Sequence, residues 1–201
     1  MSEETITLEV PPWIYRLSVI AILITLGAAG YIYTGWLVTA PVLVTGVGAL
    51  LAWSRTTYRQ PRKRRILPLY ITIVIGLLLQ QVEQWYFGYA GRLLALFPGH
   101  FAPPIHYDDT LHLLIFGLCA ISLFLLAGMG IFFHHPLGNY VGWFVMLHGI
   151  VTGVLIFVLP LLGGAAFHYM PGMISALVVI ALGVMGSIRL SQNGEIQGVL
   201  S

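Results

Sequence analysis

Six long apolar segments constrain the fold of this chain more than any other feature. They lie at about 13–33, 36–54, 66–86, 111–133, 140–162 and 172–190. Each is close to the roughly 20 residues that a helix needs to cross the hydrocarbon core of a bilayer. Charged residues make up only 8% of the chain, too few to cover a water-facing surface, since soluble domains carry about 25%. We therefore expect one all-α domain, residues 1–201, built as a bundle of six transmembrane helices.

The basic residues indicate how such a bundle is oriented. Most of the nine Lys and Arg residues fall in the 55–65 segment, between the second and third apolar segments. Arg16 and Arg189 fall on the same side, and Arg92 falls on the other. Loops rich in Lys and Arg stay in the cytoplasm, so we expect this loop and both termini to be cytoplasmic, in a bacterial inner membrane. The acidic start lacks the basic region of a signal peptide, so we expect it to be retained.

A polar stripe interrupts the third apolar segment. Gln80, Glu83 and Gln84 are spaced i, i+3, i+4 and share one helix face, with Gln81 beside them. Glu83 is the only acidic residue in a predicted span, and an acid near mid-bilayer costs roughly 2.5–3.5 kcal/mol on insertion scales. We therefore expect the stripe to face into the bundle at an internal polar site. The alternative to a functional site is a carboxyl group that simply bonds neighbouring helices.

Ionisable residues on the expected outer side offer partners for Glu83. They lie in or next to the 87–110 loop, whose mixed Gly, Pro, Leu and Phe residues predict a segment folded partly back onto the membrane. Asp108 or Asp109 is placed to cap the fourth helix. His and carboxylate side chains together suit a Zn, Fe or Mn site or an acid–base pair. The candidate metal ligands are Glu83, His106, Asp108, His112 and His168, and the candidate catalytic residues are Glu83, His112 and His148.

His148 lies near the middle of the fifth segment, with Thr152 one turn further on. One interpretation is a neutral histidine that bonds a neighbouring helix. The other is a single axial ligand for a haem or chlorin, because no second histidine lies at the same depth for bis-histidine ligation. The candidate cofactors are thus a divalent metal and, less favoured, a tetrapyrrole.

Two stretches resemble the HXXEE family of small bacterial membrane proteins. The first is Glu83-Gln84 with the aromatic residues 85–87 and the 97–101 segment Phe-Pro-Gly-His-Phe. The second is Tyr169-Met170-Pro171-Gly172, which is similar to the family's closing Tyr-x-Pro-Gly element. His148 matches its late histidine. The family's motif consists of one histidine and two glutamates. Its histidine corresponds to Gln80 and its second glutamate to Gln84, so only Glu83 of the three is retained in this chain. The resemblance covers about 77–190 and implies a polytopic fold, without a transferable activity.

Three functional hypotheses follow. The first is a membrane enzyme, dependent on a divalent metal, that acts on a lipidic or apolar substrate. The second is a non-catalytic accessory subunit of a larger, pigment- or redox-cofactor-containing membrane complex, or a homo-oligomer. The third is a small transporter or proton pathway that uses Glu83 and His148. Membrane lipids are expected partners, whereas the absence of a phosphate loop or nucleotide fingerprint argues against nucleotides, and clustering of the basic residues at one face argues against nucleic acid.

Overall fold

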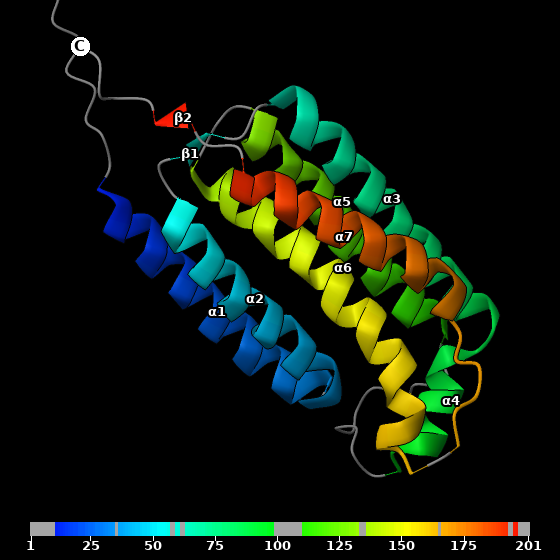
Figure 1. Cartoon of the computed structure of the whole chain (residues 1–201). Coiled ribbons are helices and arrows are strands. Elements are labelled where there is room, and N and C mark those ends of the chain that lie inside the picture. Colours follow the sequence, from blue (N-terminus) through cyan, green and yellow to red (C-terminus); the bar gives the residue numbers. More distant parts are fainter. Residues whose placement is uncertain are drawn as a thin grey trace, which may run out of the picture.

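The computed structural model describes residues 11–34, 36–56, 59–60, 63–98, 110–132, 136–164, 166–192 and 195–196. In these ranges the chain forms helices and one short antiparallel strand pair (Figure 1). The helices are α1 (Pro12–Thr34), α2 (Trp36–Thr56), α3 (Lys63–Tyr86), α4 (Tyr89–Leu96), α5 (Thr110–Phe132), α6 (Pro136–Leu162) and α7 (Met173–Gln192). The strands are β1 (Arg59–Gln60) and β2 (Glu195–Ile196).

The predicted all-α fold is confirmed, and each of the six predicted segments coincides with a helix. Among the described residues, four helices are long and apolar enough to cross a membrane, namely α1, α3, α6 and α7. A shorter apolar stretch, 120–132, lies in α5. The chain is therefore a bundle of membrane-type helices, and six spans stays a prediction.

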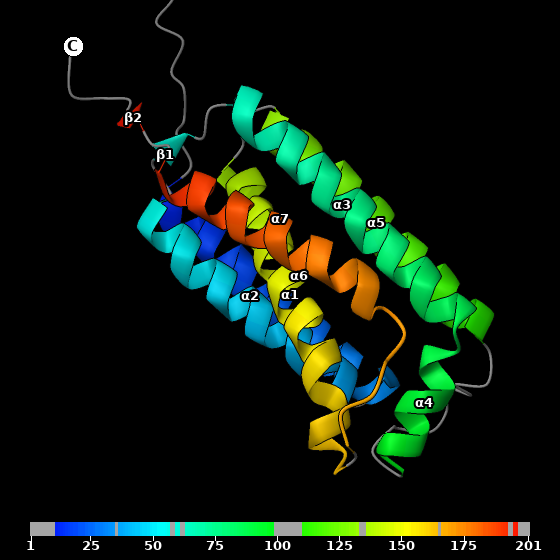
Figure 2. The same cartoon turned by 45° about the vertical axis from the view of Figure 1, so that its right-hand side comes forward.

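Four helices form the centre of the bundle. The α7 helix packs against both α3 and α6, and α5 packs against the same two helices. The α2 helix packs on the outside of α6, and α1 packs mainly against α2, so α1 is the most peripheral helix (Figure 2). Buried aromatic and aliphatic side chains fill the centre, among them Tyr70, Ile73, Met146 and Val179, and Trp53 of α2 belongs to the same buried cluster.

Glycine allows a close backbone contact between α5 and α6. A Cβ atom placed on Gly138 would lie 2.2 Å from the carbonyl carbon of Gly130 and 2.4 Å from the backbone nitrogen of Ile131. Small residues at such positions let two backbones touch, as in many membrane helix pairs. This contact holds the end of α5 against the start of α6.

The structure departs most from the sequence prediction in two places. The fifth predicted span begins at 140, whereas α6 begins at Pro136, because proline suits the first turn of a helix, where its missing N–H costs nothing. The predicted 87–110 loop contains α4, which follows a turn at Gly88 with a φ of 69°. Leu93 of α4 is buried, and Leu96 packs against Gly163. Residues 99–109 lie outside the described ranges.

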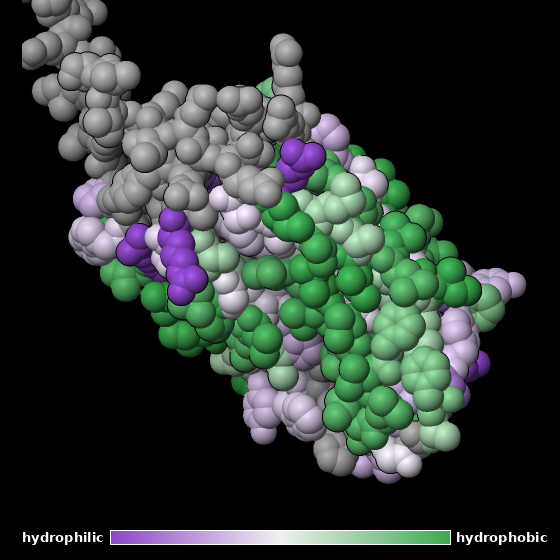
Figure 3. Space-filling view, viewed as in Figure 1, coloured by the Kyte–Doolittle hydropathy of each residue, from purple (hydrophilic) through white to green (hydrophobic). Residues whose placement is uncertain are grey.

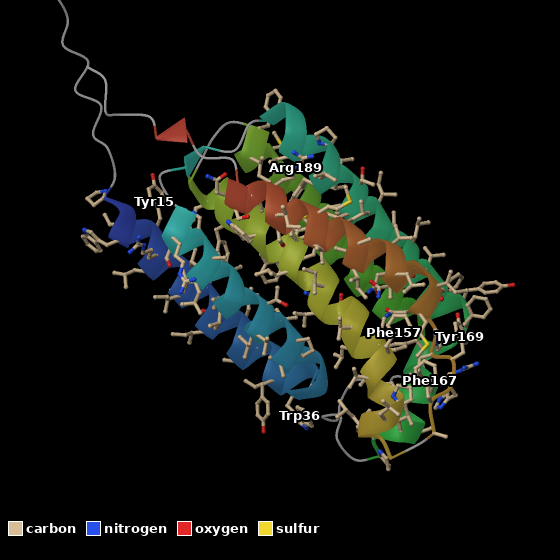
Figure 4. All side chains as sticks on the ribbon, viewed as in Figure 1. Tyr15, Trp36, Phe157, Phe167, Tyr169 and Arg189 are labelled. Carbon is tan, nitrogen blue, oxygen red and sulfur yellow. The ribbon has the colours of Figure 1, made fainter. Side chains whose placement is uncertain are left out.

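The two ends of the bundle differ in character. In Figure 3 apolar surface covers the middle of the molecule, and the most hydrophilic residues gather mainly toward the end with β1 and β2. We call this the strand end, and we call the opposite end, which carries α4, the α4 end (Figure 1). Arg189 and Tyr15 lie at the strand end, and Phe167 and Tyr169 at the α4 end (Figure 4).

Candidate functional site

Glu83 lies near the α4 end of α3, and its carboxylate accepts five hydrogen bonds from the start of α7 and the residues just before it. Oε1 accepts from the Tyr169 hydroxyl at 2.7 Å and from the backbone N–H groups of Gly172 at 2.9 Å and Ile174 at 3.2 Å. Oε2 accepts from the backbone N–H of Ser175 at 2.9 Å and from its hydroxyl at 2.6 Å. The first N–H groups of a helix have no partner within that helix. Glu83 therefore caps α7 from a neighbouring helix, where the helix dipole also favours a negative charge.

The residues before α7 explain why these N–H groups are available. Gly172 has a φ of 98°, a conformation that other residues adopt only with strain. A Cβ atom on Gly172 would also lie 3.0 Å from side-chain carbons of Gln84 and Ile156. Pro171 and Gly172 thus end the preceding segment abruptly and turn the first amides of α7 toward α3.

A second anchor holds Tyr169 in place. The Arg92 guanidinium of α4 donates to the Tyr169 carbonyl at 2.9 Å and lies 6.0 Å from the centre of its ring. The Phe87 ring meets the Tyr169 ring edge-on, with centroids 6.3 Å apart. Met170, the next residue, is fully buried with Ile156 in a small apolar cluster. The segment before α7 is therefore fixed to α3, α4 and α6 at the α4 end.

The Tyr169 hydroxyl lies in an environment that disfavours its ionised form. Partial burial raises the pKa of Tyr169 to about 12, helped by the hydrogen bond to Glu83 and by the negative charge of that carboxylate, while Arg92 acts in the opposite direction. The raised pKa means that the neutral phenol is favoured in the folded protein.

Replacing Tyr169 with phenylalanine is expected to lower the free energy of unfolding by about 1 kcal/mol at neutral pH, because one hydrogen bond to a charged acceptor is lost at a partly exposed site. This contribution is fully present below pH 10 and is lost as the pH rises toward 12. Thermal unfolding midpoints of both proteins, measured between pH 8 and pH 12, should therefore converge at the alkaline end. A constant difference across this range would contradict the assignment.

The glutamines of the stripe face the bundle, as the sequence predicts. Gln80 is only 2% exposed, and its Nε2 atom has no hydrogen-bond partner in the described part of the chain. The Gln81 side chain lies against Gly117 of α5, and that of Gln84 against Gly172. The stripe therefore contacts two neighbouring helices rather than lipid.

His148 is held among aromatic rings. Its ring stacks on Phe144, with centroids 5.6 Å apart and planes within 9°, and lies 6.0 Å from the Phe124 ring. Its buried Nδ1 atom has no hydrogen-bond partner among the described residues, and its carbonyl accepts from the Thr152 hydroxyl at 2.6 Å.

Glu83 and His148 lie at different depths in the bundle. Gly149, next to His148, packs against Val179, which in turn packs against Gly76 of α3, and Glu83 is seven residues further along α3. At 1.5 Å per residue this separates the two levels by about 10 Å. The structure thus does not bring these two candidate catalytic residues together.

The other predicted metal ligands are only partly described. His106 and Asp108 lie outside the described residues, as do His100 and Asp109. His112 belongs to the first turn of α5, and its side chain is not among those described. His168 is exposed, and its Nδ1 lies 2.8 Å from the Ala166 carbonyl oxygen. Within the described ranges, no three His, Cys, Asp or Glu side chains are grouped to bind a metal ion. The metal site stays a prediction.

Sequence reasoning missed Ser175, and it assigned Tyr169 no contact with Glu83. Both supply hydroxyl donors to Glu83, whereas the predicted partners were charged or metal-ligating groups. The available signal was the Pro171-Gly172 break directly before an apolar helix, which leaves amide donors without partners.

Comparison with known proteins finds no matching family model, no similar curated protein and no similar solved structure.

Proposed function

We propose that this protein is a non-catalytic subunit of a larger bacterial membrane complex. In this proposal the chain spans the membrane six times, and both of its termini lie in the cytoplasm. The observation that carries the proposal is the state of Glu83, the only acid in the predicted spans. Its two oxygens accept five hydrogen bonds, and a carboxylate offers about four lone-pair sites. The one acid of the stripe is thus engaged in joining α3 to α7.

The competing functions need Glu83 to be free. A general base or a metal ligand needs an available lone pair. A proton relay from Glu83 to His148 would have to cross about 10 Å between the levels of the two residues in the bundle. A metal-dependent enzyme would then have to rely on His106, Asp108 and His112. We therefore favour the structural role for the stripe.

The distribution of charge supports the proposed orientation. Arg16, which donates to the Ser54 carbonyl at 3.4 Å, belongs with Arg55 and Arg189 to the strand-end portions of α1, α2 and α7. Arg92 lies at the α4 end. By the positive-inside rule the strand end faces the cytoplasm.

We also propose that the chain is a divergent member of the HXXEE family. The two stretches that carry the resemblance are more than 80 residues apart in sequence, yet Glu83 of the first bonds Tyr169 and Gly172 of the second. A direct contact gives both elements a shared structural reason to occur together in one chain.

The test is purification of the tagged protein from its native membrane in a mild detergent. We expect another membrane protein to co-purify at a fixed molar ratio, measured by quantitative mass spectrometry, and to be lost when the detergent is harsh. A polytopic protein of similar size with the same tag serves as the control. A stable monomer in mild detergent that also forms no cross-link to another protein in intact membranes would refute the proposal.

A further inference from the structure

We propose that the Gln80 carboxamide binds an ordered water molecule inside the bundle, about one helical turn from Glu83 toward the strand end. Gln80 is 2% exposed, and its Nε2 atom has no hydrogen-bond partner among the described residues. A buried amide donor without an acceptor is costly, and the hydrocarbon around a membrane bundle offers none. Water is the hydrogen-bond acceptor small enough to occupy so enclosed a position.

The register of α3 against α7 shows what surrounds this amide. Gly76 packs against Val179, and Gln84 packs against Gly172. Since the two helices are antiparallel, the same register places Gln80 beside Ala176, which is fully buried. Alanine at this position leaves more room beside the carboxamide than any larger side chain would.

The α6 helix closes the same level with another small residue. A Cβ atom on Gly153 would lie 3.3 Å from the Ala176 carbonyl oxygen, so Gly153 and Ala176 meet at the depth of Gln80. Thr152, the neighbour of Gly153, donates its hydroxyl proton to the His148 carbonyl and keeps its oxygen lone pairs. A buried water typically makes about three hydrogen bonds. The Gln80 amide, the Ala176 carbonyl and the Thr152 hydroxyl are the groups available at this level.

The site differs from the Glu83 contact in its chemistry. Glu83 is surrounded by donors from α7, whereas Gln80 presents a donor that lacks an acceptor. The ligand at the Gln80 Nε2 atom must therefore present a hydrogen-bond acceptor, and a water molecule meets this requirement.

Solid-state NMR of the full chain in bilayers tests the proposal. Protein labelled with ¹⁵N at glutamine side chains is examined for magnetisation transfer from water protons, and the Gln80 signal is assigned as the one lost in Gln80→Met. We expect the Gln80 Nε2 signal to receive transfer from water at short mixing times. The backbone amide of Ile73, buried in the same helix, should receive none in a matched backbone-labelled sample.

Two results would overturn the proposal. One is a Gln80 side-chain signal that receives no more transfer than the Ile73 amide. The other is a rise in the unfolding midpoint of Gln80→Met, because removing an amide that bonds nothing should stabilise the protein. Leu77→Met, on the same face of α3, is the matched control for the change in side-chain shape. We expect Gln80→Met to lower the midpoint relative to this control.

Discussion

Replacing Glu83 with alanine is expected to lower the free energy of unfolding by about 3 kcal/mol, because the donors at the start of α7 lose a charged acceptor together. The backbone N–H groups of Gly172, Ile174 and Ser175 would be left without it. Unfolding in mixed micelles measures the loss. Hydrogen exchange of the amides between 169 and 175 should increase more than exchange elsewhere in the chain.

Two variants of α3 sharpen this result. Glu83→Gln keeps the shape of the side chain but turns an NH₂ group toward N–H donors. We therefore expect it to lower the free energy of unfolding, but by less than Glu83→Ala does. Val82→Ala changes a neighbouring side chain that is 42% exposed, and it should leave exchange at 169–175 unchanged. Equal losses for Val82→Ala and Glu83→Ala would show that the carboxylate does not hold α7.

The positions of the long helices could be predicted because a bilayer sets their length and composition. The predicted segment 66–86 and α3 differ by three residues at one end and agree at the other. The eight-residue α4 could not be predicted in this way, since it is too short to cross a membrane. It is stabilised by tertiary contacts, such as that of Leu96 with Gly163, which no local pattern reveals.

The candidate site shows the same division between local and tertiary information. The i, i+3, i+4 spacing of Gln80, Glu83 and Gln84 predicted a stripe that faces the bundle, and Gln80 is buried. The partners of Glu83 depend on how α3 lies against α7, and Ser175 is 92 residues away in sequence. An acid among apolar residues indicates that partners exist, but it does not distinguish a metal, a cation or a helix start.

Replacing Gly138 with alanine is expected to cost about 3 kcal/mol, at the upper end of the range for overpacked sites, because the added methyl group meets backbone rather than a movable side chain. Its Cβ would lie 2.2 Å from the Gly130 carbonyl carbon and 2.4 Å from the Gly130 oxygen. The start of α6 must then move away from α5. The loss is measured by unfolding in mixed micelles, beside a double-cysteine cross-link across the two helices that should form more slowly in the variant.

Gly91→Ala is the matched control, because Gly91 is a helical glycine of α4 with no atom within 4 Å of its added Cβ. Alanine there should be neutral or stabilise the protein by up to about 1 kcal/mol, since it is the better helix former. A small loss for Gly138→Ala with a normal cross-linking rate would mean that α5 and α6 do not touch through Gly130. Since α2 and α7 also pack against α6, a displaced α6 should destabilise the whole bundle. Glu83→Ala, in contrast, should loosen only the start of α7.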